Sequence, residues 1–74
     1  MRKLTFTQKK DGSKIALDLY SILYFYENLG AGGTVICYSL PGEIKEIPVF
    51  ETYDEVMLLL YPKEEEKPSI PSIM

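Results

Sequence analysis

The sequence predicts an α+β domain, a small antiparallel β-meander of four to five strands with one C-terminal helix packed on one face. Three observations predict this class. Most of the first 50 residues form short apolar runs of strand-like period, turn dipeptides containing glycine separate the runs, and a helix-capping pattern at residues 52–55 precedes a helical repeat. The 74 residues suffice for one domain, and 46% hydrophobic residues are typical of a globular protein. We expect one domain over residues 1–61 and a flexible tail rich in proline and glutamate over residues 62–74.

The first two strands are predicted to form a hairpin. Residues 3–9 alternate strictly, and Leu4 and Phe6 share one face, which indicates a half-buried strand. The Asp11-Gly12 pair that follows accepts the positive φ angles of a tight turn. A second strand then runs from Lys14 to residue 18 or 19, and its inward side chains are those of Ile15, Leu17 and Leu19.

The next two strands are predicted to be apolar on both faces. A short turn is expected between Asp18 and Ser21. In the strand over residues 21–27, three apolar side chains lie on one face and two on the opposite face, and the strand over residues 34–40 also has apolar side chains on both faces. The expected faces are Ile22, Tyr24 and Tyr26 against Leu23 and Phe25, and then Val35 and Cys37 against Ile36, Tyr38 and Leu40. Such a sheet must be covered on both sides.

One short helix cannot bury all of these side chains, so we expect a homo-oligomer, with a dimer as the leading choice, to cover the second face. The candidate interface residues are Leu23, Tyr24, Phe25, Tyr26, Tyr38 and Leu58.

A fifth strand and one helix complete the predicted domain. Pro41-Gly42 turns the chain into a strand over residues 43–50, where Pro48 indicates a sheet edge or a bulge. Thr52 and Glu55 have the spacing of a capping box, so a helix begins there, and Pro62 ends it. The helical stripe that packs on the sheet is Tyr53, Val56, Met57 and Leu60, which leaves Leu58 facing away.

Missing residue types exclude several chemistries. The chain has no histidine and one cysteine, Cys37, so it can build neither an imidazole-assisted nucleophile, nor a zinc cluster, nor an internal disulfide. We therefore expect no enzymatic activity, no catalytic residues, no metal and no cofactor. The apolar runs are too short to cross a bilayer, and polar residues interrupt any signal-peptide pattern near the N-terminus, so we expect a cytoplasmic protein.

Charge is unevenly distributed along the chain. The formal net charge is −3, yet the first fourteen residues carry five basic side chains against the single acid Asp11. A basic first hairpin could touch phosphate, but the acidic remainder opposes binding to a nucleic acid duplex. Sheet-surface aromatics such as Tyr24 and Tyr26 could stack on bases, although Glu27 and Glu43 border these strands where binders of single strands carry basic residues. We expect solvated lysines and packed tyrosines rather than nucleic acid contacts.

Two further segments admit a binding hypothesis beside a structural one. Gly30, Gly32 and Gly33 could bring backbone N–H groups close to an anion, but they lead into a β-branched run rather than a helix, which favours a long hairpin connection. In the tail, Ile70, Ile73 and Met74 could add to a partner's groove or sheet edge, whereas the proline content favours disorder.

Three motifs follow one another along the chain: Gly33-Thr34-Val35-Ile36, the Pro41-Gly42 turn and the capped stretch Val49 to Val56. In the order of these motifs the chain resembles the small flagellar FlbD-like proteins, and the likeness spans Leu4 to Leu60. The resemblance implies a compact sheet followed by a helix and a role in motility. The strand over residues 22–27 and the final helix are also similar to the closing half of LytTR-type DNA-binding domains. Neither resemblance implies catalytic residues.

The function that the sequence favours is a non-enzymatic binding or regulatory module, of the sort that small bacterial or phage proteins provide. It would act through homo-oligomerisation and protein–protein contacts. The alternatives are a binder or sponge for a small nucleotide-like ligand, gripped by the glycine loop and tyrosines, and a binder of single-stranded nucleic acid.

Overall fold

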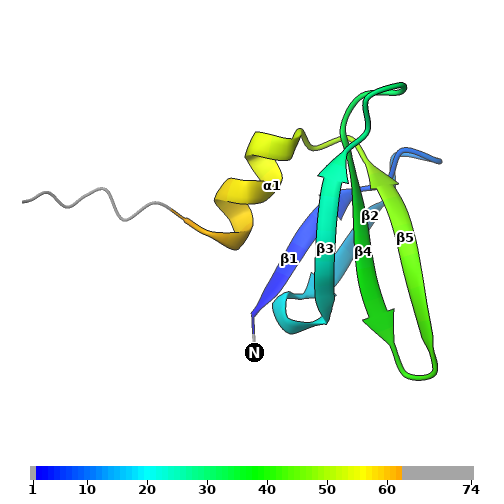
Figure 1. Ribbon diagram of the computed structural model, residues 1–74, viewed down its shortest axis with the longest axis vertical. Helices are drawn as coiled ribbons and strands as arrows, with labels where there is room; N and C mark the ends of the chain where they lie inside the picture. The colour runs from blue at the N-terminus through cyan, green and yellow to red at the C-terminus, as the bar shows by residue number, and fades with distance from the viewer. Residues whose placement is uncertain (1, 63–74) are drawn as a thin grey trace, which may run out of the picture.

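The computed structural model describes residues 2–62, which form five strands, one 3₁₀ turn and one α-helix (Figure 1). The elements are β1 (Lys3–Thr7), β2 (Lys14–Asp18), η1 (Leu19–Ser21), β3 (Ile22–Glu27), β4 (Thr34–Leu40), β5 (Glu43–Val49) and α1 (Tyr53–Leu60). Apart from Pro62, the predicted tail lies outside the described residues. The α+β class is confirmed.

The single meander is wrong, because the strands form two antiparallel sheets, β1-β2 and β3-β4-β5. Asp18 accepts a hydrogen bond from the Tyr20 N–H and starts η1, which turns the chain away before β3 can pair with β2. The first hairpin is joined instead to the far edge of the second sheet. Lys9 N–H donates to the Pro48 carbonyl at 3.0 Å and Phe50 N–H donates to the Thr7 carbonyl at 2.9 Å.

The two sheets and the helix enclose one core. The side chains of Phe6, Ile36, Val49 and Val56 are fully buried, and each comes from a different element, β1, β4, β5 and α1. The hairpin lies behind the three-stranded sheet in Figure 1, so the alternating residues of β1 and β2 pack against the inner face of β4 and β5. Pro48 occupies an edge strand, as predicted.

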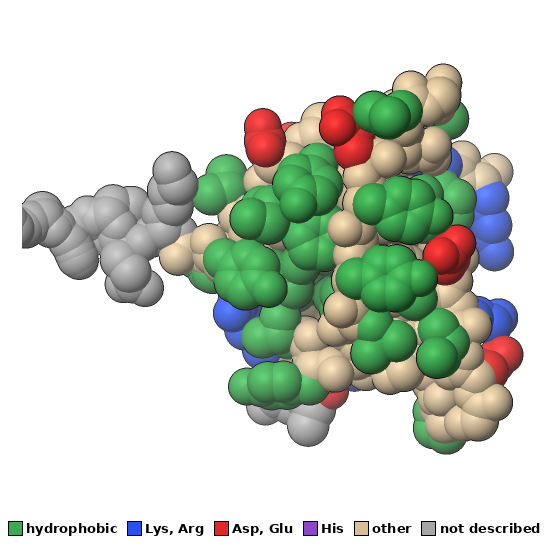
Figure 2. Space-filling view, in the orientation of Figure 1, with side chains coloured by type: hydrophobic (Ala, Val, Ile, Leu, Met, Phe, Trp, Pro, Cys, Tyr) green, Lys and Arg blue, Asp and Glu red, His purple; other side chains and the backbone are tan. Residues whose placement is uncertain are grey.

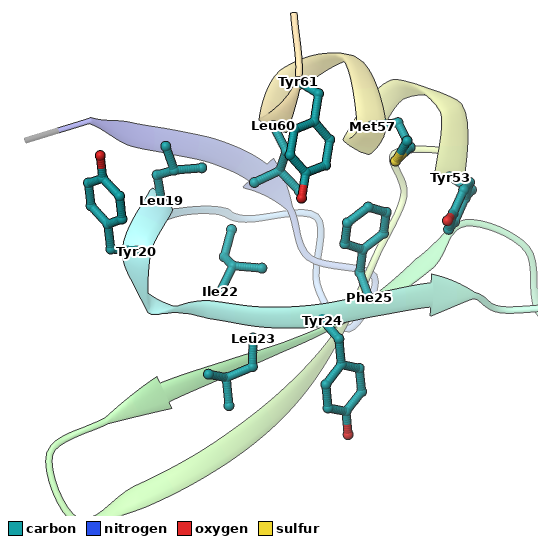
Figure 3. Close-up of a pocket in the computed structure, with 10 residues that line it drawn as sticks. All are labelled: Leu19, Tyr20, Ile22, Leu23, Tyr24, Phe25, Tyr53, Met57, Leu60 and Tyr61. Atoms are coloured by element: carbon teal, nitrogen blue, oxygen red, sulfur yellow. The ribbon is translucent and has the colours of Figure 1, made fainter.

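The predicted faces of β3 need a correction. The register with β4 shifts between Ile22 and Tyr24, so that Leu23 is an extra residue without a partner in the ladder. In consequence Ile22 shares the inner side with Phe25, and Leu23 shares the opposite side with Tyr24 (Figure 3). A strict period of two cannot reveal such a bulge.

The helix starts as the sequence predicts. The Thr52 hydroxyl accepts from the Glu55 N–H at 3.2 Å, and the Glu55 carboxylate accepts from the Thr52 N–H at 2.8 Å. α1 lies along the side of the molecule next to β1 and β3 (Figure 1). Val56 and Leu60 are buried in the core, whereas Leu58 is 49% exposed and faces away, as expected.

Glu51, just before this helix, joins three parts of the fold. Its carboxylate accepts from the Thr7 N–H at 2.9 and 3.1 Å and from the Thr7 hydroxyl at 3.0 Å. Its backbone carbonyl accepts from the hydroxyl of Thr34, which is fully buried, at 2.8 Å. Glu51 therefore links the end of β1 and the start of β4 to the segment that leads into α1.

We expect Glu51→Ala to lower the free energy of unfolding by about 2 kcal/mol, because it removes charge-assisted hydrogen bonds and leaves the partly buried Thr7 N–H without its partner. Denaturant unfolding followed by circular dichroism measures the change. Glu43→Ala, at an exposed position of β5, is the matched control and should change stability by less than about 0.5 kcal/mol. Equal effects of the two substitutions would refute this role for Glu51.

Candidate interaction surface

The outward side of the three-stranded sheet carries an open apolar surface, which we call the outer face. Cross-strand pairing places Tyr24, Cys37 and Glu46 in one row and Tyr26, Val35 and Pro48 in the next. Leu23 and Ile44 lie on the same side, because Leu23 shares the side of Tyr24 and Ile44 pairs with Ser39. The exposed fractions are 50% for Leu23, 53% for Tyr24, 43% for Tyr26 and 66% for Ile44.

The two tyrosines lie over the small side chains of β4. Their rings stack with centroids 6.3 Å apart and an interplanar angle of 25°. Val35 and Cys37 are only 8% and 2% exposed although they point to the outer side. Figure 2 shows hydrophobic side chains gathered over β3 and continuing towards α1, with few charges among them.

Glu46 is the acidic group of this face. The hydroxyls of Tyr24 and Tyr26 lie 3.4 Å from its two carboxylate oxygens, a long hydrogen-bond distance in each case. The pKa of Tyr24 is raised to about 12. The causes, in decreasing order, are a hydrogen bond with the Cys37 side chain, repulsion from charge on Cys37, partial desolvation and the Glu46 carboxylate. Desolvation and then the Glu46 charge also raise the pKa of Tyr26. The two phenols are therefore held in their neutral form.

These pKa shifts predict a loss of stability in base. The unfolded chain releases the Tyr24 proton near the ordinary value of 10.0, whereas the folded chain keeps it until about pH 12. The stabilisation is therefore complete below pH 10 and declines as the pH rises towards 12. Titration of tyrosinate absorbance should show that Tyr24→Phe removes the last proton to dissociate, and Tyr20→Phe is the control. If Tyr24→Phe instead reduced the main transition near pH 10, the environment assigned to Tyr24 would be wrong.

The six candidate interface residues occupy four places rather than one surface. Leu23, Tyr24 and Tyr26 lie together on the outer face. Phe25 points to the other side and packs against Tyr53, with ring centroids 5.1 Å apart. Tyr38 is 7% exposed and belongs to the core, and Leu58 lies on the outward side of α1.

A second apolar feature is a groove between β3 and α1, with a volume of about 530 Å³. Its walls include Leu19, Ile22 and Phe25 on one side and Tyr53, Met57 and Tyr61 on the other (Figure 3). Leu23 and Tyr24 border both the groove and the outer face. β3 is the edge strand of its sheet, so the groove runs along a strand edge.

The glycine candidates lie in the β3-β4 connection, at the opposite end of the sheet from the Pro41-Gly42 turn. Gly32 N–H donates to the Asn28 carbonyl at 2.7 Å, and Asn28 N–H donates to the Gly33 carbonyl at 3.0 Å. The Lys9 ammonium donates to the carbonyls of Ala31 and Gly32. The loop is thus closed by its own backbone and by one lysine, while anion binding by Gly30, Gly32 and Gly33 stays a prediction.

Sequence reasoning missed Ile44, Glu46 and Pro48 as members of the outer face. Their spacing of two along β5 was the available signal, because a period of two places them on one side. The sequence could not show which side faces outward.

Across residues 2–62, no three cysteine or acidic side chains gather in a way that could hold a metal ion. The part of the chain that the structure describes also contains no helix with the length and apolar character needed to cross a membrane. Comparisons with family models, with curated proteins and with solved structures found no match to this chain.

Proposed function

We propose that the chain is a non-enzymatic interaction module that self-associates through the outer face. One observation carries the proposal. Leu23, Tyr24, Tyr26 and Ile44 lie on a single open side of the sheet, and each exposes 43% or more of its surface. Burying apolar surface contributes about 25 cal/mol per Å², so covering this face favours association.

The composition of the face suits a contact between two copies. Aromatic residues are enriched and charges depleted at the centres of protein interfaces, and tyrosine offers a large rigid contact area. Two phenol donors lie beside Glu46, so its carboxylate keeps hydrogen-bond partners when the contact excludes water. A two-fold axis would bring the same face of two copies together, the commonest arrangement in homo-oligomers.

The alternative without a binding function is that these side chains remain in water, as scattered apolar surface residues do. Their contiguity over two buried β4 residues argues against it, since isolated exposed apolar residues are normal but contiguous patches mark interaction sites. The proposed role is regulatory. The FlbD-like resemblance implies a role in motility, and proteins of that process are where we would search for a further protein partner.

We expect the full chain to be a dimer at micromolar concentration, and Ile44→Lys to raise the dimer dissociation constant at least tenfold, because a charge would enter the apolar contact. Sedimentation velocity over a concentration series measures this constant. Leu29→Lys is the matched control: Leu29 is 85% exposed but lies in the β3-β4 loop, so this variant should remain a dimer.

Two results would contradict the proposal. One is a wild-type chain that stays monomeric over the whole concentration series. The other is equal weakening by Ile44→Lys and Leu29→Lys, which would show that added charge rather than the outer face decides association.

A further inference from the structure

The groove between β3 and α1 meets the proposed dimer contact at Leu23 and Tyr24, and its other wall residues lie outside that contact. Five of its wall residues are aromatic and come from both sides: Tyr20, Tyr24 and Phe25 from η1 and β3, and Tyr53 and Tyr61 from the helical segment. The Tyr61 hydroxyl points from the end of α1 into the space above β3 (Figure 3). An aromatic groove with a hydroxyl donor is the kind of site that binds polyproline II segments, whose backbone carbonyls have no internal partner.

The chain itself contains a segment of matching chemistry. Residues 68–73 read Pro-Ser-Ile-Pro-Ser-Ile, a three-residue unit that occurs twice, and Met74 follows. A polyproline II helix has three residues per turn and rises about 3.1 Å per residue, so Ile70 and Ile73 would share one side about 9 Å apart. Both serines would lie together on another side.

From these two observations we propose that the groove binds the chain's own C-terminal segment, residues 68–74, in the polyproline II conformation. The dimensions agree. α1 has eight residues and is about 12 Å long, so two isoleucines about 9 Å apart fit alongside it. Met57 lies between Tyr53 and Tyr61 on the helix and offers an adaptable apolar contact.

The same segment is poorly suited to the other docking mode, addition of a strand to the β3 edge. In an extended strand, alternate residues direct their N–H groups to the same neighbour. Pro68 and Pro71 are three positions apart, so each edge of the added strand would lack one donor. The prolines favour a conformation without ladder hydrogen bonds.

Connectivity also favours this occupant. Tyr61 is a wall of the groove, and Ile70 follows Pro62 by eight positions, a reach of at most about 28 Å. That reach exceeds the length of α1, so the segment can turn back into the groove. A tether this short gives a millimolar effective concentration, which compensates for a small contact.

The test uses the full chain with labelled isoleucine methyl groups. We expect nuclear Overhauser effects from the Ile70 and Ile73 methyls to the ring protons of Tyr53 and Tyr61. The double variant Ile70→Ser/Ile73→Ser should shift the backbone amide signals of Tyr53, Met57 and Tyr61. The double variant Ser69→Ala/Ser72→Ala changes the same segment on another side and should leave these signals in place.

Each outcome decides the proposal. Methyl-to-ring effects within one chain support it, whereas effects seen only between differently labelled chains would overturn it, because the tether argument applies within one chain. Random-coil shifts of both methyls without contacts to the rings, or equal amide shifts in the serine and isoleucine variants, would overturn it. Ile44→Lys separates this proposal from the dimer, because it should weaken association at least tenfold and preserve the methyl contacts.

Discussion

Gly33→Ala is expected to lower the free energy of unfolding by at least about 3 kcal/mol, because two penalties coincide at this position. Gly33 has a φ angle of +79°, which side chains with a Cβ rarely adopt. A Cβ built on it would lie 2.2 Å from the carbonyl oxygen of Val49 and 3.3 Å from the Val49 carbonyl carbon. Both are backbone atoms of the neighbouring strand, so a rotamer change cannot relieve the clash.

Gly42→Ala separates the two penalties. Gly42 has a φ angle of +82°, but a Cβ there would meet nothing within 4 Å. We therefore expect a loss of about 1 to 2 kcal/mol from backbone strain alone. Urea unfolding followed by circular dichroism gives both values. Similar losses of stability for Gly33→Ala and Gly42→Ala would mean that the Val49 backbone moves away from the new Cβ without a further loss of folding free energy.

This close approach also bears on the glycine loop as a candidate ligand site. At Gly33 the absence of a side chain is required by Val49, which lies sixteen positions further along the chain. The β3-β4 loop is therefore shaped in part by packing onto the end of β5. A sequence motif cannot distinguish a glycine needed for such an approach from a glycine needed for a ligand.

Local features could be predicted from the sequence because local chemistry determines them. The Thr52-Glu55 capping box, the turn at Asp18 and the alternation in β1 depend on residues within a few positions of one another. The way in which the first hairpin joins the second sheet depends instead on the bridge between Gln8 and Val49, which pairs distant parts of the chain. No periodicity within either segment encodes that contact.

The candidate surface was predicted in part for the same reason. β4 is apolar on both faces, so its sequence separates Tyr38 from Val35 and Cys37 but does not say which set faces the core. The first hairpin packs behind the three-stranded sheet and buries Tyr38, so the Tyr38 side of β4 faces the core. The tyrosines of β3 then remain on the open side, apart from Tyr38.

Phe6→Ala is expected to cost about 4 kcal/mol, within the usual range for removing a buried aromatic ring. Phe6 is 0% exposed and belongs to the core shared by both sheets and α1, so truncation leaves a cavity within the buried cluster that includes Leu17, Ile36 and Val49. Thr5→Ala is the control, because Thr5 is exposed on the same strand and its replacement should cost about 0.5 kcal/mol or less.

The Phe6→Ala loss leaves only about 1 kcal/mol of the roughly 5 kcal/mol expected for a domain of this size, so a measurable minority of the variant should be unfolded when dilute. If the outer face mediates dimerisation, mass action links folding of the variant to its concentration. Thermal unfolding followed by circular dichroism should then show a midpoint that rises clearly between micromolar and near-millimolar chain. The double variant Phe6→Ala/Ile44→Lys should lose that dependence, because it retains the cavity but not the contact. A midpoint of Phe6→Ala that does not move with concentration would show that the core is stabilised without help from a second copy.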